Sequence, residues 1–85
     1  MATGREALDN LIQSAADWAN TNDKDPKVIL LPMLMAYDLA KCRRDDLGDL
    51  SRKVMKKGIG VFEKDGLLGL KVRIIRKNDA VLDFQ

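Results

Sequence analysis

The chain of 85 residues contains no histidine and a single cysteine, and these absences exclude most common catalytic and metal-binding chemistry. Histidine is the commonest general base and the commonest metal ligand in proteins. Ser14 and Ser51 therefore have no base with which to form a Ser-His-Asp triad. One cysteine, Cys42, permits neither an intramolecular disulfide nor a cysteine-based metal cluster, and its apolar surroundings favour a buried side chain. We expect no enzyme activity, no metal site and no cofactor.

Long apolar segments and aromatic residues are also scarce. The longest strictly apolar run, residues 28–37, has about half the length that a transmembrane helix needs. The first ten residues carry Arg5, Glu6 and Asp9 in place of the apolar core of a signal peptide. We therefore expect a cytoplasmic protein that does not bind membranes. The four aromatic side chains are too few to form a stacking platform for single-stranded nucleic acid.

What the chain does contain is typical of one small folded domain. Hydrophobic residues make up 46% of the chain and charged residues 33%, whereas disordered chains combine low hydrophobicity with a large net charge. A chain of this length rarely divides further, so residues 1–85 are expected to form a single domain.

Charge is distributed unevenly along the chain. Residues 1–40 carry three basic and six acidic side chains, a net charge of −3, and residues 41–85 carry twelve basic and seven acidic ones, a net charge of +5. The excess of basic residues is greatest in residues 41–57. This asymmetry suggests a polyanion or an acidic protein surface as the partner of the second half.

Apolar spacing predicts two helices in the first half. The first follows a capping box at Thr3–Glu6 and ends at Asn20–Asp23. The second is expected from Asp25-Pro26 to about Arg43 and is apolar on every side, with Pro32 either kinking it or marking its true start.

A helix without a polar face needs a partner to cover it. A short chain can hardly cover such a helix by itself, so we expect a homodimer through this second helix. The expected interface residues are Val28, Leu31, Met35 and Leu39. The alternative is a central helix wrapped by the rest of the same chain.

The second half is expected to hold one more helix and then strands. The third helix would be capped by Asp45 or Asp46 and end at Gly58. After Gly58 apolar residues recur at every second position, which predicts a hairpin with strands at 59–63 and 68–76 and a turn at 64–66. A short third strand is expected at 80–84. The predicted fold class is α+β, with three helices followed by a two- or three-stranded antiparallel β-sheet.

The third helix gathers its basic residues opposite its apolar side. Steps of about 100° per residue place Leu47, Leu50 and Val54 on the buried side and most of the basic side chains on the other. The passage from Leu50 to Ile74, LSRKVMKKGIGVFEKDGLLGLKVRI, resembles in outline a recognition helix that runs into the wing of a winged helix-turn-helix.

We therefore expect a non-enzymatic module that binds double-stranded DNA, in the role of a small transcriptional regulator. The expected phosphate contacts are Arg52, Lys53, Lys56, Lys57, Lys71 and Arg73. The alternative function is a protein-binding adaptor or inhibitor that docks through its apolar second helix.

Overall fold

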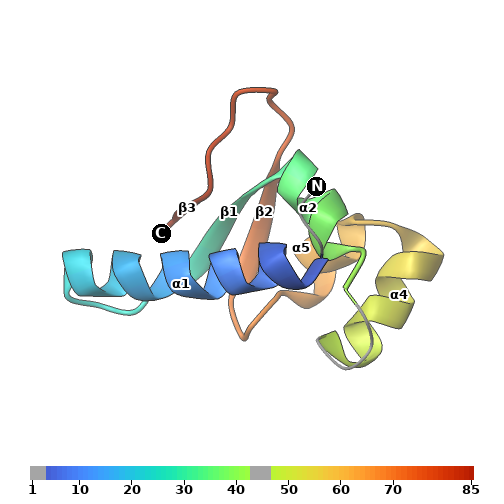
Figure 1. Cartoon of the computed structure of the whole chain (residues 1–85), viewed down its shortest axis with the longest axis horizontal. Coiled ribbons are helices and arrows are strands. Elements are labelled where there is room, and N and C mark those ends of the chain that lie inside the picture. The colour runs from blue at the N-terminus through green and yellow to red at the C-terminus, as the bar shows by residue number, and fades with distance from the viewer. Residues whose placement is uncertain (1–3, 43–46) are drawn as a thin grey trace.

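Helices and strands are interleaved along the chain (Figure 1). The computed structural model describes residues 4–42 and 47–85. Its elements, in chain order, are α1 (Gly4–Asn22), β1 (Val28–Pro32), α2 (Met33–Leu39), α4 (Asp49–Lys57), α5 (Gly60–Asp65), β2 (Lys71–Ile75) and β3 (Asp83–Phe84).

The three strands form one mixed sheet with β1 in the middle, in the order β2-β1-β3. β1 runs parallel to β2, with Leu30 opposite Arg73, and antiparallel to β3, with Ile29 opposite Phe84. Two parallel strands need a long crossover connection. Here the connection between β1 and β2 includes α2, α4 and α5.

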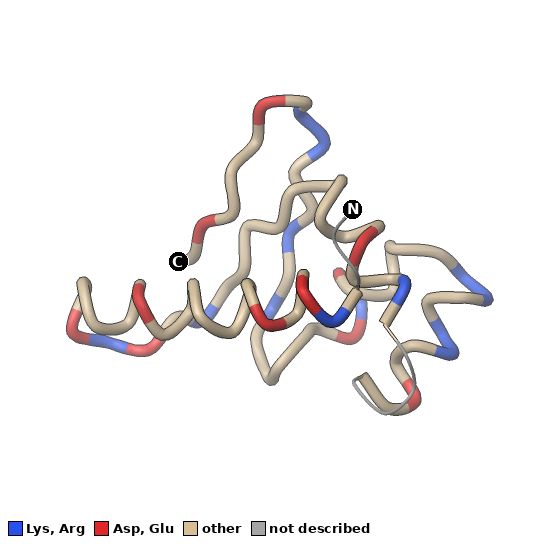
Figure 2. The backbone as a smooth tube through the Cα atoms, in the orientation of Figure 1, with Lys and Arg blue, Asp and Glu red and all other residues tan. Residues whose placement is uncertain are grey.

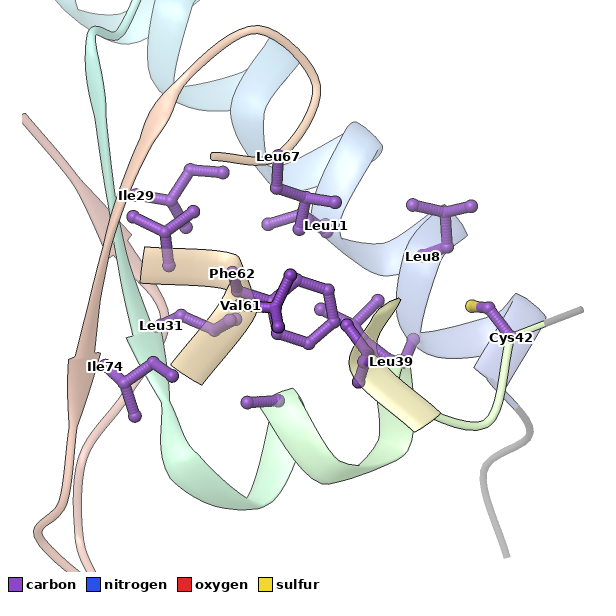
Figure 3. Close-up of a cluster of buried hydrophobic side chains, with 14 of the residues drawn as sticks. Leu8, Leu11, Ile29, Leu31, Leu39, Cys42, Val61, Phe62, Leu67 and Ile74 are labelled. Carbon is purple, nitrogen blue, oxygen red and sulfur yellow. The ribbon is translucent and has the colours of Figure 1, made fainter. Parts of the chain in front are cut away.

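The helices pack on the sheet face to which Ile29, Leu31 and Ile74 point (Figure 3). Alternate residues of a strand point to opposite faces, and Ile29, Leu31, Val72 and Ile74 are buried in the core that they share with the helices. Their neighbours in the strands are half-buried or exposed and do not belong to this core. The sheet thus has one face against helices and one face outside the core.

Phe62 of α5 lies at the centre of the buried cluster, with no exposed surface (Figure 3). Leu11 of α1 and Leu39 of α2 are buried as completely around it. At the other end of α1 the ring of Trp18 packs against Phe84 of β3, with the ring centroids 6.4 Å apart. Burying a large apolar side chain contributes about 1.5–3 kcal/mol, so these contacts hold α1, α2, α5 and the sheet together.

The N-terminus of α1 packs directly against the backbone that follows α2. The thiol of Cys42 donates a hydrogen bond to the carbonyl oxygen of Gly4 over 3.0 Å, and Cys42 is buried, as the sequence predicts. A Cβ atom on Gly4 would lie only 2.5 Å from the backbone nitrogen of Cys42. The close approach of these two segments therefore requires glycine at position 4.

At Ile74 the outer edge of β2 is covered by two side chains. In a parallel ladder alternate residues direct their backbone groups away from the neighbouring strand, and Ile74 is such a residue. Its N–H donates to Oε2 of Glu63 over 3.4 Å, and its carbonyl oxygen accepts from Nη1 of Arg76 over 3.5 Å. An ion pair of 3.2 Å between Arg76 Nη2 and Glu63 Oε1 joins the two side chains.

The predicted order of elements and the predicted antiparallel sheet are wrong. Residues 28–32, expected in a long second helix, form the central strand β1. Pro32 ends this strand, and α2 begins immediately after it at Met33, so the proline marks the true start of the helix. Proline disfavours a helical conformation in the residue before it, and an all-round apolar run has no period to separate a strand from a helix.

The predicted hairpin after Gly58 is also wrong. Residues 60–65 form the helix α5, and Val61 and Phe62 are both buried. A strand would direct these neighbours to opposite faces, whereas adjacent positions of a helix can both point into one core. Within residues 68–76 only Lys71–Ile75 form a strand, and its partner is β1.

Other expectations are confirmed. The first helix is present as α1, α4 ends at Gly58, and β3 lies within the predicted third strand. The capping residues expected at Thr3, Asp45 and Asp46 lie outside the described residues.

Candidate functional site

α4 lies at one end of the molecule, to the right in Figure 1, and packs against α5. Its inner side carries Ser51 and Val54, which are both buried. The Ser51 hydroxyl donates to the carbonyl oxygen of Gly48 over 2.9 Å. Gly58 has φ 88° and ends the helix, and its N–H donates to the carbonyl oxygen of Val54. Local hydrogen bonds thus close both ends of α4, and its inner side is buried.

The outer side of α4 carries a basic surface, which we define by its four cationic side chains. All four are exposed, and Figure 2 shows the basic positions along this helix: Arg52, Lys53, Lys56 and Lys57. Met55 is 81% exposed beside them, the largest exposed fraction among the large apolar side chains of the described residues. The basic surface therefore includes one apolar side chain that no core contact requires.

One of the four cations is engaged within the chain. Lys53 Nζ lies 3.2 Å from Asp65 Oδ2, at the end of α5. Within residues 4–42 and 47–85, no ion-pair partner lies near Arg52, Lys56 or Lys57. Three of the four charges are therefore available to an anionic ligand, and the fourth would have to leave an exposed ion pair, which contributes at most about 1 kcal/mol.

The other two predicted phosphate contacts lie elsewhere. Lys71 and Arg73 are exposed on β2 and point to the sheet face outside the core. β2 lies in the middle of the molecule and α4 at its end (Figure 1). The structure brings Arg52, Lys53, Lys56 and Lys57 together on one helix and does not join Lys71 and Arg73 to them.

The predicted homodimer residues do not form one surface. Leu31 and Leu39 have no exposed surface, because both are part of the chain's own core. Met35 is half-buried on α2, and Val28 is half-buried on β1, outside the core. The homodimer stays a prediction, but Leu31 and Leu39 are occupied within one chain.

A groove between α1 and α2 was missed from the sequence. It has a volume of about 490 Å³ and is lined by apolar and acidic residues and one amide: Glu6, Ala7, Asn10, Pro32, Leu34, Met35 and Asp38. Leu34 is 66% exposed, and Tyr37, one helical turn away, is 51% exposed. If the predicted helix had begun after Pro32 rather than at Asp25-Pro26, its outward face could have been predicted. Leu34, Tyr37 and Asp38 have the i, i+3 and i+4 spacing of residues on one face of a helix.

Across the described residues no group of three or more Cys, Asp or Glu side chains is placed to hold a metal ion. No helix in the same residues is long and apolar enough to cross a membrane.

No protein family, curated protein or solved structure matches this chain. Its function is therefore inferred from its own surfaces.

Proposed function

We propose that this chain is a non-enzymatic DNA-binding module that holds the phosphate backbone of duplex DNA with α4. The observation that supports the proposal is the exposure of all four cations of α4, Arg52, Lys53, Lys56 and Lys57, on a helix whose opposite side is buried. Lysine and arginine side chains on a rigid helix are the usual source of phosphate contacts in DNA-binding proteins.

The charges of α4 favour contact through its second half. Asp49 lies in the first turn and repels phosphate, whereas Lys56 and Lys57 lie in the last turn. A helix of nine residues with one arginine on its outer side offers little for base reading. We therefore propose binding that depends on the backbone rather than on the base sequence, in a cytoplasmic protein.

The number of phosphate contacts can be measured from the way the DNA-binding constant depends on salt concentration. Each neutralised phosphate contributes about −0.9 to the slope of log K against log salt concentration, so three to four contacts predict a slope of about −3. Fluorescence anisotropy with a labelled random duplex, between about 50 and 200 mM salt, measures this slope.

Two double variants locate the contacts, because each removes two positive charges. Arg52→Ala with Lys56→Ala is expected to reduce the slope by about 2. Lys71→Ala with Arg73→Ala, on β2, is the matched control and is expected to change it by less than about 1. No binding by the wild type at low salt, or an unchanged slope for Arg52→Ala with Lys56→Ala, would rule out α4 as the contact surface.

The second candidate function is protein binding through the groove between α1 and α2. Its support is the exposure of Leu34 and Tyr37, since exposed apolar side chains that cluster beside a groove mark interaction sites. Leu34→Glu separates the two candidates, because it changes the groove without removing a cation from α4. Loss of protein association with unchanged DNA binding is the expected result if both surfaces function.

A further inference from the structure

Met55, in the second half of α4, contributes almost nothing to the core. Its side chain is 81% exposed and does not pack against the buried cluster. Leu50 and Val54 of the same helix do pack there. α4 is therefore held on the protein without Met55, and this apolar side chain is free to contact a ligand.

Two cations lie beside Met55 on the outer side of α4. Arg52, three residues earlier, and Lys56, the next residue, lie within about 100° of it around the helix. Both are exposed, and in the part of the chain that the structure describes neither has an ion-pair partner. Asp49, in the first turn, lies six residues before Met55, about 9 Å along the helix axis. Single exposed apolar side chains are common, but this one lies next to cations that are available to a polyanion.

We propose that Met55 inserts between neighbouring base pairs of a bound duplex and kinks it, while Arg52 and Lys56 hold phosphates beside the opened step. The inference rests on the proposed contact between α4 and duplex DNA and adds how the DNA is deformed. Apolar side chains, methionine among them, kink DNA by inserting between base pairs from the minor groove. Methionine suits this role because it is unbranched and flexible, and because its sulfur makes favourable contacts with aromatic rings.

The dimensions of DNA and the residues of α4 favour the minor groove. This groove is about 6 Å wide and a helix is about 10–12 Å across, so the helix stays outside and only its side chains enter. Insertion from this side bends the duplex toward the major groove, away from the protein. The major groove would admit the helix itself, but α4 has only one arginine with which to read base edges there.

Insertion of Met55 would select DNA by how easily it deforms. Pyrimidine–purine steps such as TA unstack easily, whereas A-tracts are stiff. We therefore expect binding to a duplex with central TA steps to be about fivefold tighter than binding to an A-tract duplex of the same length. Electrostatic attraction alone gives the opposite order, because the narrow minor groove of an A-tract attracts cations more strongly.

Two labelled duplexes measure the deformation directly. The first carries 2-aminopurine, a fluorescent adenine analogue that stacking quenches, in a central TA step. Insertion of Met55 is expected to raise its emission about twofold or more. The second carries a donor and an acceptor dye at its two ends, and a kink is expected to raise the energy transfer between them because it shortens the distance that separates the dyes.

Three variants assign these signals to one side chain. Met55→Ala changes no charge, so it is expected to keep the salt dependence of binding but to lose both signals and the preference for TA steps. Met55→Leu keeps a large apolar side chain and is expected to keep the signals. Val81→Ala, at a residue that is 80% exposed between β2 and β3, is expected to behave as the wild type. Circular dichroism confirms that all three are folded.

The possible failures are distinguishable. A wild type that binds with the expected salt dependence but changes neither signal would overturn the insertion and leave the phosphate contacts in place. Signals from Met55→Ala as large as those from the wild type would overturn the role of Met55. No binding of the wild type to either duplex at low salt would overturn this inference together with the proposed function.

Discussion

The segment from Val28 to Leu39 and the helix α4 differ in which of their side chains are buried. The segment spans β1 and α2 and buries apolar residues from both, with Ile29, Leu31 and Leu39 fully enclosed. α4 buries one side, at Ser51 and Val54, and exposes the other. The secondary structure of α4 could be predicted because polar side chains mark its exposed face. That of residues 28–39 could not, because exposed positions such as Leu34 and Tyr37 are apolar as well.

The largest expected effect is the loss of stability when Leu31 is shortened. Leu31 has no exposed surface, whereas Leu34, three residues later in the same apolar run, is 66% exposed. Leu31→Ala leaves a cavity and is expected to lower the free energy of unfolding by about 2–5 kcal/mol. Leu34→Ala is the matched control, with an expected change within about 0.5 kcal/mol. Urea unfolding followed by circular dichroism measures both.

Equal losses from the two leucine variants would contradict the assignment of Leu31 to the core and Leu34 to the surface.

A smaller effect is expected at the end of α4. Gly58 has φ 88° and ψ −177°, a conformation that is essentially restricted to glycine, and no atom lies within 4 Å of where its Cβ would be. Gly58→Ala therefore tests backbone strain alone, and we expect a loss of about 1–3 kcal/mol in thermal or urea unfolding.

Gly60, the first residue of α5, is the control for this change. It has open space around its Cβ position but no positive φ. Alanine is favoured over glycine in helices, so Gly60→Ala is expected to be neutral or to add up to about 1 kcal/mol. A loss of stability at Gly60 as large as that at Gly58 would show that φ is not the cause.

The smallest effect on stability is expected on the outer side of α4. Arg52→Ala with Lys56→Ala removes two exposed side chains that pair with no acidic group among the described residues. The expected change in the free energy of unfolding is within about 0.5 kcal/mol. Differential scanning calorimetry measures this change. A loss above about 1 kcal/mol would mean that these cations stabilise the fold rather than being available to bind a ligand.

The parts of the fold that were predictable carry a local signal. α1 and α4 show one apolar and one polar face, and Gly58 is a residue that ends helices by its backbone freedom. The burial of Cys42 followed from its apolar surroundings. The exposed cations of α4 were predictable for the same reason, because a charged side opposite an apolar one must face water.

The rest depends on contacts that are distant in sequence. The parallel pairing of β1 with β2 joins residues 28–32 to residues 71–75, and no local pattern encodes it. Once β2 pairs with β1, residues 60–65 have no strand partner and form α5, which covers the core with Val61 and Phe62. The groove was missed because it exists only where α1 and α2 meet.

The bridge from Glu63 and Arg76 to Ile74 has a consequence for how copies of this chain can meet. An uncovered edge strand is a template on which further strands add without limit, which leads to fibrils and aggregates. Here both outward backbone groups of Ile74 are already bonded, to a carboxylate and a guanidinium. At Ile74, therefore, the edge of the sheet has no free backbone group to which an added strand could bond.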